Sequence, residues 1–290
     1  MSYYLERIQC GVDYIEARLD REIPLQDVAK AAGISQWHFQ RMFKALTGET
    51  LKGYIRGRRL AGSLEHLLTS QLRVLDIALI AGFESQEAFA RAFKQAFDLT
   101  PQQYRSLGDK SLFLKKVSFD PEYLRHINQN LSLTPEIYKQ PRLLLVGKRT
   151  LFYSVDSEKN NIAERLVPLW QSFLPHLSEI EQRVSDYCYG VVRQEAPDSD
   201  RLEYHAATAV TAVGKLPEGF VAFDLPAGKY AKFAHRGPAR DVNHTVNYAY
   251  STWLAQSEYR HTYAPDLEIY GADYHPTSAD SLLHYSIPIG

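Results

Sequence analysis

DVAKAAGISQWHFQRMFKALTG, from Asp27 to Gly48, has the pattern of a helix-turn-helix, and DIALIAGFESQEAFARAFKQAFD, from Asp76 to Asp98, repeats it about fifty residues later. Gly33 and Gly82 stand at the same point of the two copies. The repeat predicts two recognition helices in one chain. Such a chain can read two stretches of major groove without dimerising, so we expect it to bind double-stranded promoter DNA as a monomer.

The charge of the chain is unevenly distributed. Its 290 residues carry a net charge of −1. Residues 1–110 hold 15 Lys and Arg against 13 Asp and Glu, whereas residues 111–290 hold 18 against 21. Between Gln36 and Arg59 there are six basic residues and one acidic residue, Glu49. A local basic stripe is typical of phosphate contact, although a solvated helix face can have the same composition.

The length and the cysteine content limit the class of protein. A chain of this size should contain two domains, or three small ones. Cys10 and Cys188 are far apart, so we expect no disulfide, no metal cluster and no cofactor. The N-terminus lacks an apolar signal core, and no run of about 18 apolar residues is present. We therefore expect a cytoplasmic protein that does not enter the membrane.

The first repeat predicts helices over residues 25–32 and 36–46. Gly33 suits the tight turn between them, and Ser35 is a favourable N-cap for the second helix. The inner face of the second helix is apolar. Its outer face carries amide, indole and basic side chains, which are Gln36, Trp37, Gln40, Arg41 and Lys44.

This outer face is chemically suited to reading bases. Arg41 can donate two hydrogen bonds to guanine, Gln40 can pair with adenine, and Trp37 can lie against a thymine methyl group or a sugar. The alternative is that Trp37 belongs to the core and Arg41 is merely solvated. We predict that the face binds DNA, because phenylalanines already fill the core side of the helix.

A longer helix, predicted over residues 51–68, would separate the two readers like a strut. The second repeat then predicts a support helix over 74–81 and a recognition helix over 86–97, capped by Ser85. Thr100 and Pro101 open a short closing helix. The residues that the second helix leaves for DNA are Gln86, Glu87, Arg91 and Lys94.

The C-terminal half predicts an α+β domain. A strand over 143–149, a helix over 162–177 and strands over 187–194 and 204–213 come first. The same order returns in a strand over 229–235, a helix over 242–257 and strands over 267–270 and 283–289. A duplicated strand-helix-strand-strand unit forms one sheet with helices on one side, and a groove at the junction of the halves is a common small-molecule site.

A carboxylate and several aromatic residues mark this groove in the sequence. Glu268 lies in a short strand that we expect to be mostly buried, where a carboxylate needs a partner. A cationic ligand is one candidate, and an ion pair or an outward orientation is the alternative. The predicted ligand-binding residues are Glu268, Tyr270, Tyr187, Tyr189, Trp170 and Trp253.

The N-terminal strings SQWHFQRMFKALTG, YIRGRRL, GFESQEAFARAFK and TPQQYR resemble the DNA-binding domain of the AraC/XylS family of transcription regulators. The resemblance implies a homeodomain-like double helix-turn-helix over residues 1–107. It also implies DNA reading through Trp37, Gln40, Arg41, Gln86, Glu87 and Arg91. The family usually has glutamine at the position of Glu87, which leaves the base preference there open.

The C-terminal segments PAGKYAKFAHRGP, LEIY and LLHYSIPI are similar to GyrI-like effector-binding domains. The resemblance implies an effector domain over 135–290, after a linker over 108–134, with Glu268 in the ligand cleft. Regulators that combine the two domains activate stress and multidrug-resistance genes and contact RNA polymerase. We therefore expect a non-enzymatic activator that is modulated by a cationic or amphipathic small molecule. The alternatives are a protein-interaction module and a vestigial hydrolase.

Overall fold

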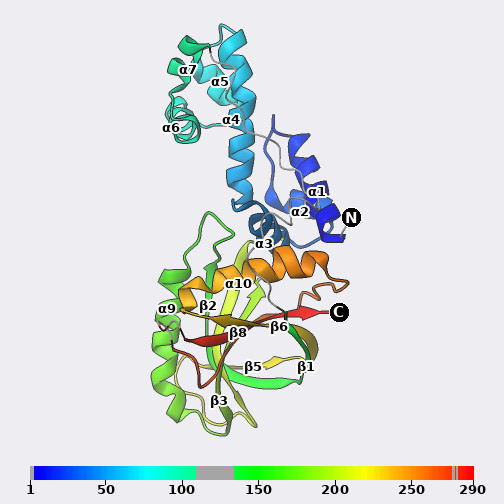
Figure 1. Ribbon diagram of the computed structural model, residues 1–290. Helices are drawn as coiled ribbons and strands as arrows, with labels where there is room; N and C mark the ends of the chain where they lie inside the picture. The colour runs from blue at the N-terminus through cyan, green and yellow to red at the C-terminus, as the bar shows by residue number, and fades with distance from the viewer. Residues whose placement is uncertain (1–2, 109–133, 276–277, 279) are drawn as a thin grey trace.

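The computed structural model describes residues 3–108, 134–275, 278 and 280–290. Most of the predicted linker, residues 109–133, lies outside the described residues. Within the described part of the chain, no helix is both long and apolar enough to cross a bilayer. The described residues form a helical N-terminal region and a C-terminal sheet domain (Figure 1).

The N-terminal region contains the predicted helices. A further helix precedes them and ends at Glu16, where the chain turns over residues 17–20. The others keep the predicted positions to within one residue. The helices are α1 (Tyr3–Glu16), α2 (Leu25–Ala32), α3 (Gln36–Thr47), α4 (Leu51–Thr69), α5 (Val74–Ile80), α6 (Gln86–Phe97) and α7 (Pro101–Leu107).

Local turn chemistry explains where the recognition helices begin. Gly33 has a φ of 69°, a left-handed conformation that glycine adopts without steric cost. The Ser35 side chain accepts a hydrogen bond from the His38 backbone N–H, and Ser85 accepts one from Ala88. Both predicted N-caps are confirmed.

The second helix-turn-helix has a hydrophobic core of its own. Phe89, Phe93 and Tyr104 are buried together with leucines from the C-terminal part of α4. The 19 residues of α4 span about 28 Å, at about 1.5 Å per residue. This length holds α5, α6 and α7 away from the C-terminal domain, at the far end of the molecule (Figure 1).

The C-terminal domain is built on one antiparallel sheet with strand order β1-β6-β8-β7-β3-β4-β2-β5. Its halves meet where β3 pairs with β7. The strands are β1 (Glu136–Gln140), β2 (Leu143–Tyr153), β3 (Arg183–Gln194), β4 (Arg201–Val210), β5 (Val221–Leu225), β6 (Gly228–Arg236), β7 (Asp266–Tyr270) and β8 (Leu282–Ile289).

Two edge strands were not predicted from the sequence. β1 precedes β2 in the chain but pairs with β6, and β5 precedes β6 but pairs with β2. The two halves thus exchange their edge strands. A short strand that pairs with a distant partner carries little local signal, which is why the repeat pattern did not indicate it.

Helices of the two halves lie over the same face of the sheet. α9 (Ile162–Phe173) packs on β2 and β4, and α10 (Val242–Tyr248) packs on β6. α10 continues into a π-helical segment, η3 (Ala249–Leu254). The predicted α+β layout is confirmed. On this face, buried side chains of the strands pack against the helices, such as Tyr204 in the first half and Phe233 in the second.

We expect Phe93→Ala to destabilise the second helix-turn-helix by about 3–5 kcal/mol, because the ring is fully buried and its loss leaves a cavity. Hydrogen exchange should show reduced protection in α5, α6 and α7 but not in the C-terminal sheet. Leu79→Ala, an exposed site on α5, is the control and should change stability by less than about 0.5 kcal/mol. Equal protection in the two variants would contradict the assigned core.

Candidate functional site

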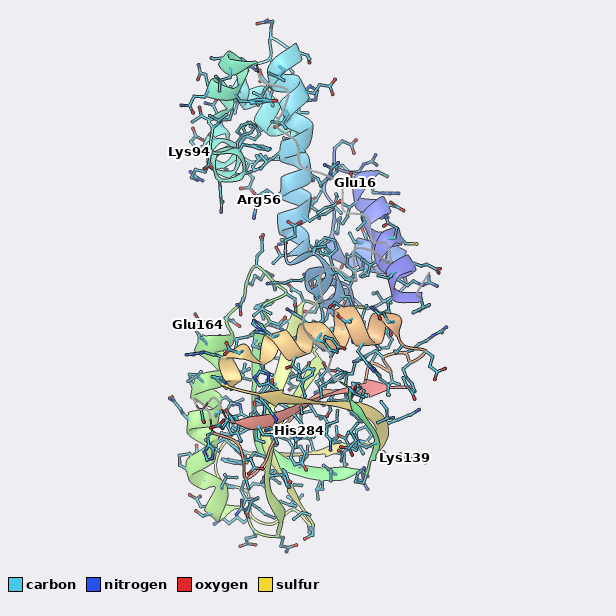
Figure 2. All side chains as sticks on the ribbon, viewed as in Figure 1. Glu16, Arg56, Lys94, Lys139, Glu164 and His284 are labelled. Carbon is cyan, nitrogen blue, oxygen red and sulfur yellow. The ribbon has the colours of Figure 1, made fainter. Side chains whose placement is uncertain are left out.

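The second recognition helix, α6, presents its predicted outer face to solvent. Gln86, Glu87, Arg91 and Lys94 are exposed, whereas the phenylalanines on the opposite face are buried. Lys94 lies on this free part of the molecule (Figure 2). The Glu87 carboxyl accepts hydrogen bonds from the Glu87 backbone N–H and from Ser85, which lower its pKa. Its negative charge therefore also stabilises the N-terminus of α6.

The first recognition helix, α3, is in a different environment. The predicted reading residues Gln36, Trp37, Gln40 and Arg41 are only 8%, 2%, 4% and 6% exposed, and Lys44 is half-buried. The face is therefore covered in this conformation, and the prediction that it binds DNA stays a prediction. The cause is the C-terminal domain, which covers the face.

Polar contacts attach α3 to loops of the C-terminal domain. Lys44 Nζ donates a hydrogen bond to the Val155 carbonyl oxygen. Arg41 Nε lies 3.4 Å from a carboxylate oxygen of Asp156. At the start of the helix, the Gln36 backbone N–H donates to the Pro197 carbonyl oxygen over 3.4 Å. α3 also packs against α10 and η3.

Trp37 is part of the core of the C-terminal domain. It belongs to the buried cluster that contains Phe152, Phe173 and Tyr204, and Trp170 packs against the same cluster. The alternative interpretation of Trp37 as a core residue thus holds in part, although the core is that of the other domain. The same cluster includes Leu169 and Phe173 of α9.

The Arg41 guanidinium lies among aromatic rings and carboxylates. Its Cζ is 5.6 Å from the ring centroid of Trp37 and 5.4 Å from that of Tyr250. Burial works against the charge of Arg41, but Asp156, Tyr250 and Asp266 with other phenols outweigh it and raise the pKa of the guanidinium. Arg41 is therefore a buried cation held by the C-terminal domain.

The contact leaves several buried polar atoms of α3 without a hydrogen bond. Among the described residues, Trp37 Nε1, His38 Nε2 and two Arg41 nitrogens, Nε and one terminal nitrogen, have no hydrogen-bonding partner, and neither does one carboxylate oxygen of Asp156. An unsatisfied buried group costs about 1–3 kcal/mol. The interface therefore combines favourable apolar burial with a penalty that release of α3 would remove.

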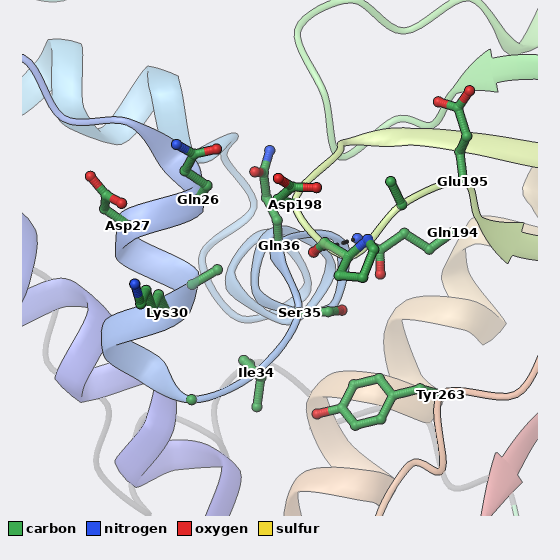
Figure 3. A pocket seen from close by; sticks show the side chains of 14 residues that line it. Gln26, Asp27, Lys30, Ile34, Ser35, Gln36, Gln194, Glu195, Asp198 and Tyr263 are labelled. Atoms are coloured by element: carbon green, nitrogen blue, oxygen red, sulfur yellow. Dashed lines mark hydrogen bonds between the residues drawn. The ribbon is translucent and has the colours of Figure 1, made fainter.

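A pocket of about 870 Å³ borders the contact. It lies between the α2–α3 turn and a C-terminal loop, and Gln36, Asp198 and Tyr263 point toward it (Figure 3). Gln36 lines this pocket but is itself only 8% exposed.

Glu268 is the centre of an aromatic cluster, as predicted. The Tyr204 and Tyr270 hydroxyls donate to the same Glu268 carboxylate oxygen, over 2.5 and 2.7 Å. Trp170 Nε1 donates to the Tyr204 hydroxyl over 3.1 Å, and its ring lies 4.9 Å from that of Tyr270. Burial raises the pKa of the Glu268 carboxyl, and the two tyrosine hydrogen bonds oppose this shift.

Glycine at position 190 makes room for the cluster. Gly190 lies opposite Glu268 on the neighbouring strand, and a Cβ there would collide with the Tyr204 hydroxyl and the Glu268 carboxylate. Tyr204 completes the cluster but was not among the predicted residues. Its place on β4, opposite Val192, could not be deduced without the strand register.

Three of the predicted ligand-binding residues do not join Glu268. Tyr189 packs on the opposite face of the sheet, near Val191 and Leu267, because successive residues of a strand face opposite sides. Trp253 stacks near Tyr259 and contacts Phe233, on the other side of η3. Tyr187 is exposed beside Gly271.

A second buried carboxylate was missed in the sequence. The Tyr250 and Tyr285 hydroxyls donate to Asp266 over 2.6 and 2.5 Å, and His261 Nε2 lies 3.0 Å from its other oxygen. Asp266 is two residues before Glu268 on β7, so the two carboxylates share one face. The pattern Asp-x-Glu in a short strand was the available signal.

Comparison with known proteins agrees with both halves of the structure. Residues 28–106 match the helix-turn-helix domain family, and residues 134–289 match the GyrI-like small molecule binding domain. The chain is similar to the transcriptional regulator Rob of Salmonella typhimurium, with 31% identity over 267 residues, covering 89% of this chain and 87% of that protein.

Two further similarities cover most of the chain and its N-terminal part, respectively. The right origin-binding protein of Escherichia coli is 31% identical over 270 residues, which cover 89% of this chain and 87% of that protein. A crystal structure of a transcriptional regulator with an AraC-type DNA-binding domain from Chromobacterium violaceum is 24% identical, with a TM-score of 0.35. It covers 36% of this chain and 94% of that chain.

The GyrI-like match takes in more than half of the chain, and the identity to the Rob proteins extends through both domains. This agrees with the tandem helix-turn-helix and the duplicated sheet domain described above. The chain belongs to the AraC-type DNA-binding transcription regulators that carry a GyrI-like small molecule binding domain.

Proposed function

We propose that this regulator reads DNA with the outer faces of α6 and α3 and that a lipophilic cation, bound at Glu268, modulates it. The observation that carries the proposal is the half-buried Glu268 carboxylate inside a cluster of Trp170, Tyr204 and Tyr270. The membership of this chain in the family supports promoter DNA as the target. We further propose that the protein is a cytoplasmic activator of stress and drug-resistance genes, which binds DNA as a monomer and contacts RNA polymerase.

The DNA-binding part of the proposal follows from the residue types of the two outer faces. Arginine and glutamine match the donor and acceptor groups of the major groove, and lysines near the helix ends suit phosphates. α6 carries Gln86, Arg91 and Lys94 in an exposed position. α3 carries Gln40 and Arg41, which become available to DNA only when the face is uncovered.

The ligand-binding part follows from the electrostatics of the cluster. A buried carboxylate favours a cationic partner, and aromatic faces attract cations with little desolvation cost. The tyrosine hydroxyls fix the carboxylate, so the site is preformed. A bulky cation without hydrogen-bond donors suits this site, because the Glu268 oxygen already accepts two hydrogen bonds.

We expect Arg91→Ala to weaken binding to a duplex selected by the full chain from a random pool by about 1–3 kcal/mol, with the loss concentrated at one base pair. The reason is that Arg91 is exposed on the outer face of α6, where it can contact a base edge. Fluorescence anisotropy with single-base variants of the duplex measures the effect.

Arg165→Ala is the matched control, since it removes one exposed positive charge from α9. It should change the affinity uniformly and slightly. If Arg91→Ala weakened binding equally to every duplex, the side chain would be a phosphate anchor rather than a base reader.

We expect tetraphenylphosphonium to bind the full chain and Glu268→Gln to weaken this binding by about tenfold or more, because the substitution removes the buried negative charge. Calorimetry measures both affinities. Tetraphenylborate has the same shape and the opposite charge, and it should not bind. Glu164→Gln, an exposed acid on α9, should leave the affinity unchanged. Equal affinity of the cation for the Glu268→Gln variant would refute the assigned site.

A further inference from the structure

We propose that α3 is an internal competitor of the cationic ligand: Trp37 and Arg41 pack into the aromatic and acidic clusters of the C-terminal domain, and a ligand that binds there frees α3 for DNA. This inference rests on the proposed function, and it adds the device by which the ligand controls the DNA-binding face. The two residues supply an aromatic ring and a cation, which are the same chemical features as those of an aromatic cation.

The cleft contacts of α3 overlap with those of the proposed ligand. Trp37 is buried in the cluster that contains Tyr204 and packs against Trp170 and Tyr270. Those three residues surround Glu268. Because Trp37 and Tyr204 belong to one buried cluster, a ligand that enters at Glu268 has to disturb the cluster that holds the indole.

The charge of Arg41 acts on the same carboxylates. Asp156 and Asp266 both favour the charged form of Arg41, and Arg41 opposes the rise that burial causes in the pKa of Glu268. A second cation in the cleft would share these carboxylates with the guanidinium and repel it. Entry of a cation thus weakens the binding of α3 to the C-terminal domain in two ways, by disturbance of the cluster that holds Trp37 and by electrostatic repulsion of Arg41.

The alternative state of α3 has its own partners. Two nitrogens of Arg41 and Nε1 of Trp37 are donors that make no hydrogen bond in the closed contact, although Arg41 Nε is ion-paired with Asp156. In the major groove, the guanidinium would find guanine O6 and N7. DNA and the C-terminal domain therefore compete for one face of α3. Because the cation releases this face, the cation must strengthen DNA binding, and DNA must strengthen binding of the cation by the same factor.

The repeat supplies a matched pair of probe positions. Gln36 and Gln86 are the first residues of α3 and α6, and only the first is buried. In a Cys10→Ser background, Gln36→Cys and Gln86→Cys each place a thiol at one of these positions. Buried Cys188 stays in both proteins. The rate of modification by N-ethylmaleimide reports which face is covered.

We expect saturating tetraphenylphosphonium to raise the modification rate of the Gln36→Cys protein by about tenfold or more and to leave that of the Gln86→Cys protein within about twofold. Tetraphenylborate should have no effect on either. If the Gln36→Cys rate stayed constant while the cation bound, the competition would be disproved.

A second variant opens the contact without ligand. Asp156→Asn removes the charge partner of Arg41 but leaves the Glu268 cluster and the DNA-reading residues intact. It should raise the Gln36→Cys rate, tighten tetraphenylphosphonium binding by about tenfold and increase affinity for the selected duplex. The control is Asp224→Asn. It removes an acid of the edge strand β5 that is paired with Arg142, and it should have none of these effects.

The failures of the two proposals are distinguishable. If tetraphenylphosphonium binds neither the natural chain nor the Asp156→Asn variant, the ligand site itself is wrong and the inference falls with it. If the cation binds through Glu268 while Asp156→Asn leaves both its affinity and the Gln36→Cys rate unchanged, only the internal competition is wrong.

The closed contact should also weaken in acid. Burial, with His261 and Arg41 nearby, holds the pKa of His38 well below its ordinary value. The groups that face His38 are Arg41, Tyr250, His261 and Tyr263. Released His38 takes up a proton near its usual pKa of about 6.5, so stability of the contact is complete above that pH and is lost progressively below it.

We therefore expect the ratio of the Gln36→Cys to the Gln86→Cys modification rate to rise between about pH 7.5 and 5.5. The ratio removes the intrinsic pH dependence of the thiol reaction. His38→Gln, which cannot take up a proton in this range, should flatten the profile. A constant ratio in the chain that retains His38 would contradict the closed contact.

Discussion

The burial of a cation between the two domains is the constraint on which the arrangement depends. Arg41 is removed from water, so its charge must be balanced by the domain that covers it. Asp156 contacts it directly, and Asp266 adds a second negative charge that Tyr250, Tyr285 and His261 hold in place. Because a buried pair is strongly destabilised when one partner is lost, the position of α3 is coupled to the charge state of the cleft.

The two copies of the helix-turn-helix have similar sequences but different surroundings. α6 stands on a core of its own at the end of α4, and its outer face is exposed. α3 shares its surroundings with the C-terminal domain, and the core around α1, α2 and α3 continues into Phe233, Tyr250 and Ile289. The outer face of α6 is thus exposed to solvent, whereas the C-terminal domain covers the outer face of α3. In the proposed function, this asymmetry gives one chain a constant DNA contact and a regulated one.

The sequence predicted those features that depend on neighbouring residues. The helices, Gly33 in the turn and the Ser35 and Ser85 caps follow from local chemistry, and Glu268 was found because a carboxylate in an apolar strand needs a partner. The edge strands β1 and β5 pair with distant partners, and Tyr189 falls on the wrong face because only the pleat and register fix its direction. The cover over Trp37 and Arg41 was not predictable, since an outer face rich in arginine and indole looks the same whether it meets DNA or protein.

That ambiguity has a physical origin. A side chain set that reads bases must offer directed donors and a flat ring, and the same groups fit a cleft of carboxylates and aromatic rings. One face cannot contact both partners at once, so occupancy of the groove and occupancy of the cleft exclude each other. A small cation changes this balance only by its different affinity for the open and the closed state. The closed state leaves polar atoms of Trp37, His38 and Arg41 without hydrogen bonds, so release of α3 removes part of the penalty that a bound cation would otherwise have to overcome.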